Sequence, residues 1–405
     1  MTSCKHRLEM DVLIAARGRI SLMFDECRNI YVSFSGGKDS TVLLHLVVEE
    51  ALKRDRKVGV FFVDLEGQYK LTIDHILECL NLYSGIIIPY WVALPITLRN
   101  AVSMYMPTWI CWERGREFDW IRQPPSNAII DEKYFPFYRY AMDFGDMVLD
   151  FGEWFSQQES TACFVGLRTD ESLNRFRTIA SKYKECLDGI KWTTKSSEHV
   201  FNAYPLYDWR TEDIWAYFGK SGKPYNKLYD LMHRAGLSIH QMRTCQPYGD
   251  DQRKGLWLFQ IIEPETWGKV VARVNGANSG ALYAQESGNI LGNIKITKPE
   301  GHTWESFAKL LLGSLPPKTQ EHYKAKIGVF IKWWMEHGYP DGPVDSGDVK
   351  QEANRELPSW KRICKALLRN DYWCRGLSFA PQGPDTYQRY IERQKENRRQ
   401  WGLTF

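Results

Sequence analysis

Short apolar runs alternate with amphipathic segments over roughly the first 235 residues of this chain. Continuous apolar runs, typical of strands buried on both faces, occur at IYVSFS (30–35), VGVFFVDLE (58–66) and TACFVGLR (161–168). Segments with apolar residues at helical spacing, TVLLHLVVEEALKR (41–54) and YKLTIDHILECLNLY (69–83), lie between them. Because strands that alternate with helices pair in parallel, the pattern predicts an α/β fold with a doubly wound, mostly parallel sheet.

The pattern changes near residue 245, where strands give way to helices and turns. Before this point we also expect a third strand at 84–94, helices at 10–27, 142–158 and 210–222, and a Trp- and Pro-rich, lid-like insertion near 105–136. After it, helical segments are predicted at 263–274, 303–315, 318–338, 351–370 and 385–402. The sequence therefore predicts a nucleotide-binding domain over 1–240 and a mainly helical C-terminal domain over 241–405.

Composition adds few constraints. Of the 405 residues, 43% are hydrophobic and 25% are charged, which is ordinary for a globular protein. The net charge of +4 is small, so a nucleic-acid surface would have to be a local patch. No stretch is apolar over the length of a transmembrane helix, and the N-terminus lacks a signal peptide, so we expect a cytoplasmic protein. The nine cysteines include no CxxC pair, which indicates a reducing compartment and predicts neither an iron–sulfur cluster nor zinc.

The stretch SFSGGKDS (33–40) joins the first predicted strand to the helix that we expect to begin after Ser40. A glycine turn at the carboxyl end of a parallel strand presents backbone N–H groups and the positive end of a helix dipole. Gly36 and Gly37 permit the sharp turn and a close approach of the backbone to a ligand. These features predict an anion site.

Four polar side chains accompany the glycines. Ser35 and Ser40 add hydroxyl donors, and Lys38 adds a point charge suited to phosphate. Asp39 would repel a phosphate that it faced, so we expect it to hold Mg²⁺ or to orient the loop. An ordinary strand–turn–helix with chance serines would show the same letters. The six positions of SGGKDS, placed between a predicted strand and a predicted helix, nevertheless favour a functional turn.

The turn lacks the GxxxxGK[ST] spacing of a Walker A loop and resembles the PP-loop, SGGxDS, of the N-type ATP pyrophosphatase superfamily. In that family the loop binds the pyrophosphate end of ATP, and attack on the α-phosphate gives an adenylylated product, or AMP, and pyrophosphate. The resemblance implies an adenine nucleotide α-hydrolase-like fold, ATP and Mg²⁺ as ligands, and catalytic roles for Lys38 and Asp39. The implied nucleotide-binding residues of the turn are Ser33, Phe34, Ser35, Gly36, Gly37, Lys38, Asp39 and Ser40.

Two acidic residues follow the second predicted strand. Asp64 and Glu66 are expected at the same sheet edge as the turn, where a carboxylate would bind Mg²⁺ or pair with Lys38. We include both in the nucleotide site and Asp64 as a second metal ligand. The alternative is the general preference of acidic residues for the first turn of a helix.

The third apolar run ends in GLRTDESLNR (166–175), which brings two arginines to this edge. Arg168 and Arg175 are suited to clamping a phosphate or sulfate bidentately, and we assign them catalytic roles. A solvated helix with a Glu171–Arg175 pair at i, i+4 would explain the same residues without a ligand.

Three segments in the same order resemble the phosphoadenosine-phosphosulfate (PAPS) reductase-like branch of the PP-loop superfamily. They are G-x-R-x-x-E-S-x-x-R (166–175), P-L-x-D-W-x-x-x-D-[IV]-W (205–215) and P-Y-N-x-L-Y-D (224–230). This resemblance implies that Gly166, Glu171 and Ser172 contribute to nucleotide binding. EPETWGKVVARVNGANSGALYA (263–284) and LGNIKITKPEGHTWESFAKLLLGSLP (291–316) resemble the C-terminal extension of the IbrA/YbdN-type subfamily.

A reductase is one alternative, since sulfonucleotide reductases resemble this chain. They carry a cysteine in a C-terminal E-C-G-[LI]-H segment, which is absent here, and Cys364 and Cys374 lie in the tail without that pattern. The PP-loop of such reductases is typically degraded, whereas SGGKDS is intact. The intact turn favours ATP α,β-bond cleavage, with Arg168 and Arg175 gripping an acidic or nucleobase substrate.

A nucleotide-binding regulatory module is the other alternative. IbrA-type proteins resemble parts of paired systems with a ParB-like partner, which would make nucleic acid an indirect target. The basic segment 385–402 would then touch nucleic acid or a partner, although a solvated helical face explains its charges equally well. The acceptor is left open among sulfate, a carboxylate, a nucleobase carbonyl and water, and the tryptophans of 105–136 either pack or stack on a base.

Overall fold

The computed structural model describes residues 9–103, 106–181, 183–249, 256–274, 296, 298–315, 317–348, 351–352, 357–368, 371 and 374–377. The contacts divide the chain into two compact units. The first comprises Met1–Leu98, Ile110–Pro247 and Leu258–Arg273, and the second comprises Arg99–Trp109, Tyr248–Trp257 and Val274–Phe405. The predicted helix at 385–402 lies outside the described residues.

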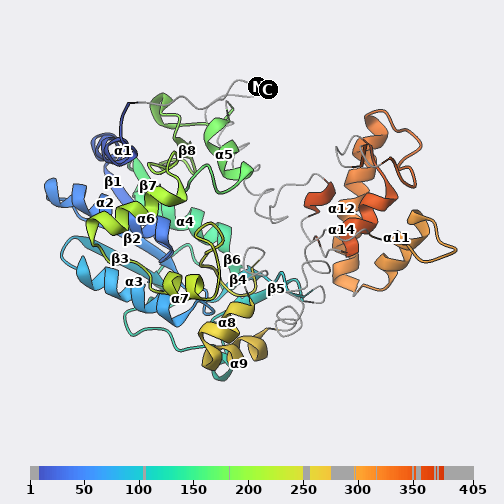
Figure 1. Ribbon diagram of the computed structural model, residues 1–405, viewed down its shortest axis with the longest axis horizontal. Helices are drawn as coiled ribbons and strands as arrows, with labels where there is room; N and C mark the ends of the chain where they lie inside the picture. Colours follow the sequence, from blue (N-terminus) through green and yellow to red (C-terminus); the bar gives the residue numbers. More distant parts are fainter. Residues whose placement is uncertain are drawn as a thin grey trace. The chain divides into compact units, whose positions relative to one another are not determined.

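A six-stranded sheet with the order β3-β2-β1-β7-β9-β8 forms the centre of the first unit (Figure 1). Its first five strands are parallel, and only β8 pairs with its neighbour in antiparallel fashion. The predicted doubly wound, mostly parallel fold is therefore confirmed. The strand bounds are β1 Asn29–Ser33, β2 Val58–Val63, β3 Ile87–Val92, β7 Thr161–Val165, β8 Thr193–Lys195 and β9 Val200–Ala203.

Helices cover both faces of this sheet. One face packs against α1, α2, α3 and α6 in a core that includes Val32 and Val60. The opposite face packs against α4, where Phe151 stacks on Phe61 with ring centroids 3.7 Å apart and meets Tyr31 edge-on. Alternate residues of β1 and β2 thus face opposite layers, which explains their unbroken apolar runs. The helix bounds are α1 Val12–Glu26, α2 Lys38–Lys53, α3 Lys70–Leu82, α4 Phe144–Ser156, α5 Leu173–Ala180, α6 Thr211–Ser221, α7 Leu228–Arg234, α8 Trp257–Ile262 and α9 Pro264–Arg273.

Some details of the first unit differ from expectation. Helix α2 begins at Lys38, whereas the apolar pattern placed its start after Ser40. The polar residues of the turn are thus the first turn of the helix, because helical hydrogen bonding does not require apolar side chains. The short strands β8 and β9 were not predicted, since their sequences TTK and VFNA lack a clear apolar pattern.

The predicted insertion contains the strand β5 and a short 3₁₀ helix, Glu117–Asp119. A second sheet has the strand order β5-β4-β6, and β4 pairs with β6 in parallel. Within the insertion Trp112 is buried, and its indole Nε1 donates to the carbonyl of Asp64 at 2.7 Å. This tryptophan therefore packs against the end of β2. The strand bounds are β4 Ile96–Arg99, β5 Thr108–Cys111 and β6 Met142–Asp143.

Three helices, α11 Trp304–Gly313, α12 Pro317–Glu336 and α14 Trp360–Leu368, provide the described core of the second unit. Phe307, Tyr323 and Ile363 bring the three helices together around that core. In the described part of the chain, no helix is long and apolar enough to cross a membrane.

Candidate functional site

The SGGKDS turn connects β1 to α2 and requires glycine at position 36. Gly36 has a φ of 68°, in the left-handed region, and a Cβ there would lie 2.8 Å from Cγ1 of Ile76. The hydroxyl oxygens of Ser35 and Ser40 are 3.0 Å apart, and the Ser40 hydroxyl also donates to the Gly37 carbonyl at 3.1 Å. The hydrogen bonds of the two serines therefore connect the beginning and the end of the turn.

The N-terminus of α2 offers backbone donors beside this turn. Among the described residues, the N–H groups of Asp39 and Ser40 have no hydrogen-bond acceptor. These groups lie in the first turn of a 16-residue helix, where its dipole favours an anion. Backbone donors without acceptors at a helix N-terminus are the groups that bind anions in proteins, so these two N–H groups are where the predicted anion would bind.

Residues of the segment 224–230 form hydrogen bonds with the turn. The Asn226 side chain donates to the Gly36 carbonyl at 3.0 Å and to the Thr72 hydroxyl at 2.9 Å. The Tyr229 hydroxyl accepts from the Lys38 backbone N–H at 3.0 Å. We did not predict Asn226 and Tyr229 as site residues, although the PYNKLYD motif that contains them had been identified.

Lys38 is buried, and its ammonium group has three described neighbours. Its Nζ atom donates to the Met242 carbonyl at 3.3 Å, lies 3.3 Å from a carboxylate oxygen of Asp39 and sits 5.5 Å from the centre of the Tyr229 ring. These contacts hold a positive charge at the helix N-terminus. Lys38 does not pair with Asp64, which had been an alternative role for that carboxylate.

Arg168 is almost completely buried and points its guanidinium at protein groups. Its Nε donates to Asp39, and its Nη1 donates to Asp170 at 2.6 Å and to the Thr211 hydroxyl at 3.3 Å. A third carboxylate, that of Glu171, lies 3.6 Å from Nη2. In this structure Arg168 therefore fixes the position of Asp39, whereas we had expected it to grip a second substrate.

The rest of the GLRTDESLNR segment forms a capped helix beside Arg168. Arg175 forms an ion pair with Glu171, as the i, i+4 alternative predicts, and Ser172 caps α5 by accepting from the Arg175 N–H at 3.2 Å. Gly166 lies directly against α2, because a Cβ on it would be only 2.9 Å from the backbone nitrogen of Ser40. The structure thus brings Gly166 to the turn, whereas Glu171, Ser172 and Arg175 interact with one another.

The structure places Asp64 and Glu66 in an ion-pair cluster without exposed surface. Asp64 accepts from the Trp91 indole at 2.8 Å and pairs with Arg122, and Glu66 pairs with Arg273 at 2.8 Å. Mg²⁺ at nucleotide sites usually keeps several water ligands. A carboxylate without exposed surface leaves no room for those waters, so the contacts of Asp64 support a structural role in place of the predicted metal-ligand role, whereas the Asp39 carboxylate is partly exposed.

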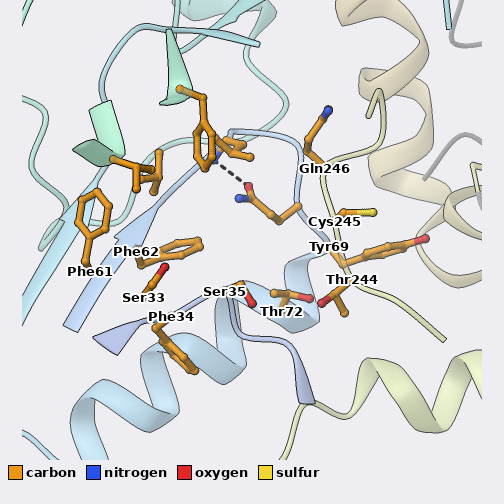
Figure 2. A pocket seen from close by; sticks show the side chains of 15 residues that line it. Ser33, Phe34, Ser35, Phe61, Phe62, Tyr69, Thr72, Thr244, Cys245 and Gln246 are labelled. Carbon is orange, nitrogen blue, oxygen red and sulfur yellow. Dashed lines mark hydrogen bonds between the residues drawn. The ribbon is translucent and has the colours of Figure 1, made fainter. Parts of the chain in front are cut away.

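A cavity of about 250 Å³ opens beside the turn. Figure 2 shows Phe61 and Phe62 on one side and Thr244, Cys245 and Gln246 on the opposite side. Ser33, Phe34 and Ser35, which we predicted to bind nucleotide, also line it. The cavity therefore runs from the polar turn to an aromatic compartment, a combination suited to a phosphorylated ligand with a flat ring. The remaining lining residues are Val63, Leu65, Gln68, Tyr69, Thr72, Phe144 and Val148.

The two cysteines of the tail are poorly suited to nucleophilic attack. Cys364 and Cys374 are buried in the core of the second unit. Burial raises the pKa of each thiol to about 12, so the reactive thiolate is scarce at neutral pH. In the described ranges, no group of three or more His, Cys, Asp or Glu side chains is placed to hold a metal ion.

A buried histidine supports the turn from behind. His75 Nε2 lies 3.0 Å from the Thr41 hydroxyl, which donates to the Gly37 carbonyl at 2.8 Å. Burial lowers the pKa of His75 to about 4, and burial likewise lowers the pKa of His45 on α2 to about 4. Both imidazoles are therefore neutral at pH 7.

Acid is expected to destabilise this protein before carboxylates are protonated. The unfolded chain binds a proton at each histidine below a pKa of about 6.5, and the folded chain does so only near 4, so stability is lost as the pH falls through this window. Linkage predicts that the free energy of unfolding falls by about 3 kcal/mol per histidine between these two pH values.

Urea unfolding at pH values from 7 to 4.5 measures the loss of stability. His75→Gln should flatten the profile, whereas the exposed His233→Gln should leave it unchanged, and an equal slope in both variants would contradict the assignment.

Comparison with known proteins shows two matching families. Residues 29–235 match the phosphoadenosine phosphosulfate reductase domain, and residues 236–344 and 342–388 match a domain of unknown function (DUF3440). The uncharacterized protein YbdN of Escherichia coli (strain K12) is 44% identical over 406 residues, covering 100% of this chain and 99% of that protein.

Solved structures that match part of this chain include two enzymes from yeasts. The PAPS reductase of Candida auris, in a phosphate complex, has 13% identity and a TM-score of 0.29, covering 57% of this chain and 95% of that one. The FMN adenylyltransferase of Candida glabrata, in complex with ATP, has 18% identity and a TM-score of 0.31, covering 54% and 57%. Residues 29–235 make up just over half of the chain, and YbdN matches the whole of it, so this protein belongs to the phosphoadenosine phosphosulfate reductase domain family, in the PP-loop superfamily.

Proposed function

We propose that this chain binds ATP at the SGGKDS turn and cleaves the bond between its α- and β-phosphates. The products would be pyrophosphate and either AMP or an adenylylated acidic or nucleobase substrate. The observation that carries the proposal is the intact turn, whose Asp39 and Ser40 N–H groups have no acceptor among the described residues. The aromatic cavity beside Ser35 supports the proposal, because its lining suits an adenine ring.

Each residue has a distinct role in this mechanism. The helix N–H groups and Lys38 stabilise negative charge on the departing pyrophosphate, which is electrostatic catalysis. Arg168 keeps Asp39 at the turn, where the Asp39 carboxylate would hold an Mg²⁺ ion. Such an ion would supply Lewis-acid stabilisation of the phosphates. Ser35 and Ser40 keep the turn in its anion-binding conformation.

Product analysis tests the proposal. Labelled ATP and Mg²⁺ are incubated with the protein, with and without sulfate, and AMP, ADP and pyrophosphate are resolved. We expect AMP or an adenylyl product together with pyrophosphate. Formation of ADP and phosphate without AMP would exclude the mechanism. Thioredoxin-dependent release of sulfite from PAPS would instead support the reductase alternative.

Lys38→Met is expected to lower the turnover of ATP by about 100-fold or more, because it removes a buried charge from the leaving group's site. The measurement is the rate of pyrophosphate release, together with the Kd for ATP from calorimetry. Lys53→Met is the matched control, since Lys53 lies at the exposed end of the same helix. Unchanged ATP affinity and turnover in Lys38→Met would remove Lys38 from the site.

A nucleotide-binding regulatory module is the second candidate, and the contact between Tyr229 and the turn favours it. The Tyr229 hydroxyl accepts from the Lys38 N–H, which is one of the donors at the helix N-terminus. A partner that moved this hydroxyl would change the affinity for phosphate. ATP binding without turnover under all conditions would support this candidate over the enzyme.

A further inference from the structure

One wall of the cavity is the loop between β2 and α3, residues 64–69. Leu65, Gln68 and Tyr69 line the cavity, and Glu66 lies between them. Glu66 has a φ of 64°, a conformation that residues with side chains seldom adopt. The shape of this wall therefore depends on contacts that restrain Glu66.

Arg273, the last residue of α9, provides the main restraint. Its Nε donates to one carboxylate oxygen of Glu66 at 2.8 Å and its Nη2 to the other at 3.2 Å, and both side chains are buried. The carboxylate also accepts from the N–H groups of Trp112 at 2.7 Å and Ile121 at 3.1 Å. A bidentate, charge-assisted pair has a fixed geometry, so Arg273 sets both the position and the direction of Glu66.

Helix α8 contacts the same wall. Phe259 stacks on Tyr69 with ring centroids 3.7 Å apart and an angle of 12° between the planes. The Glu263 carboxylate accepts from the Leu71 N–H at 3.3 Å, at the start of α3. Pro247 packs against Gly67, where a Cβ would lie 2.8 Å from its ring. These contacts come from the region that matches the domain of unknown function.

The Gln68 side chain is the group of this wall that is suited to recognising a ligand by hydrogen bonding. Its carbonyl oxygen accepts from the Leu65 N–H at 3.1 Å, which orients the amide. The amide N–H₂ group thus remains to donate to an acceptor on a ligand in the cavity. Ring nitrogens of a purine are such acceptors, and the aromatic lining suits the ring itself.

We propose that residues 244–247 and 258–273 form the specificity wall of the nucleotide cavity and that Arg273 is its positioning residue. The Arg273–Glu66 pair holds Leu65 and Gln68 against the bound base, while Thr244, Cys245 and Gln246 complete the lining. This inference rests on the proposed ATP site. It gives part of the domain of unknown function a definite role in choosing the nucleotide.

Calorimetric titration of the full-length protein with ATP, GTP and CTP tests this role. We expect Arg273→Met to weaken ATP binding by at least 10-fold and to reduce the preference for ATP over the other nucleotides. Arg273→Lys keeps the charge but loses one of the two bonds, so it should fall between Arg273→Met and the wild type. Lys269→Met is the matched control, because Lys269 is exposed on the same helix, and it should bind as the wild type does.

Hydrogen exchange separates positioning from general unfolding. In Arg273→Met we expect faster exchange at residues 64–69, while residues 29–33 of the central sheet keep their protection. If Arg273→Met does not fold, Arg273→Lys carries the test alone. A folded variant that binds ATP with wild-type affinity and selectivity would overturn the inference. Wild-type protein that binds no ATP would instead overturn the proposed function on which it rests.

Discussion

Gly166→Ala is expected to weaken ATP binding by more than 100-fold and to lower the free energy of unfolding by about 2 kcal/mol. A Cβ at Gly166 would lie 2.9 Å from the backbone nitrogen of Ser40 and 3.0 Å from the carbonyl carbon of Asp39. Both atoms belong to the first turn of α2, so the clash is relieved only by moving the anion site itself. Calorimetric ATP titration and urea unfolding measure the two effects.

Gly219→Ala is the matched control for this substitution. Gly219 lies in α6, where a Cβ would meet nothing within 4 Å. Alanine favours a helix over glycine by roughly 1 kcal/mol, so this variant should be slightly more stable and should bind ATP normally. Normal ATP binding in Gly166→Ala would show that the close approach of β7 to α2 is not required for the site.

Arg168→Met is expected to cost about 3–5 kcal/mol of stability, because it leaves carboxylates around a buried position without their cation. Arg168 is 2% exposed and binds Asp39, Asp170 and the Thr211 hydroxyl. The rate of ATP turnover should also fall in this variant, since Arg168 is the group that positions Asp39. The free energy of unfolding from urea titration and the rate of pyrophosphate release check both effects.

A double variant separates the two roles of Arg168. Arg168→Met combined with Asp39→Asn removes one uncompensated charge, so it should regain part of the stability but none of the activity. The exposed Arg177→Met on α5 is the control and should be neutral. If Arg168→Met unfolds at the wild-type urea concentration, the guanidinium is not the anchor of Asp39.

The parallel strands were predictable because burial on both faces leaves a continuous apolar run. β2 and β7 lie within their predicted runs, and β1 begins one residue before its run. Strand β9 was not predictable, since its four residues VFNA are too few to show a pattern and its pairing with β7 is not visible in the local sequence. The start of α2 was misjudged for a related reason: apolar spacing reports which side chains pack, and Lys38, Asp39 and Ser40 form helix without contributing to that spacing.

The candidate site divides in the same way. The turn itself was predicted, and Ser35, Gly36 and Ser40 have the local contacts that an anion-binding turn needs. The contacts of Asn226 and Tyr229 with the turn were not predicted, because these residues lie about 190 positions away from it in the sequence. Their motif indicated a family, but no local property indicated that they touch the turn.

By itself the sequence determined the features that depend on neighbouring residues. The glycines of the turn, its serines and the strand and helix on either side all act over a few positions, so their pattern indicates an anion site directly. Only the tertiary structure decided which charges meet. Arg168 pairs with Asp39, Glu66 with Arg273 and Asp64 with Arg122, and each pair joins segments far apart in the chain. Buried charges require partners, and the fold alone chooses among the many that the sequence offers.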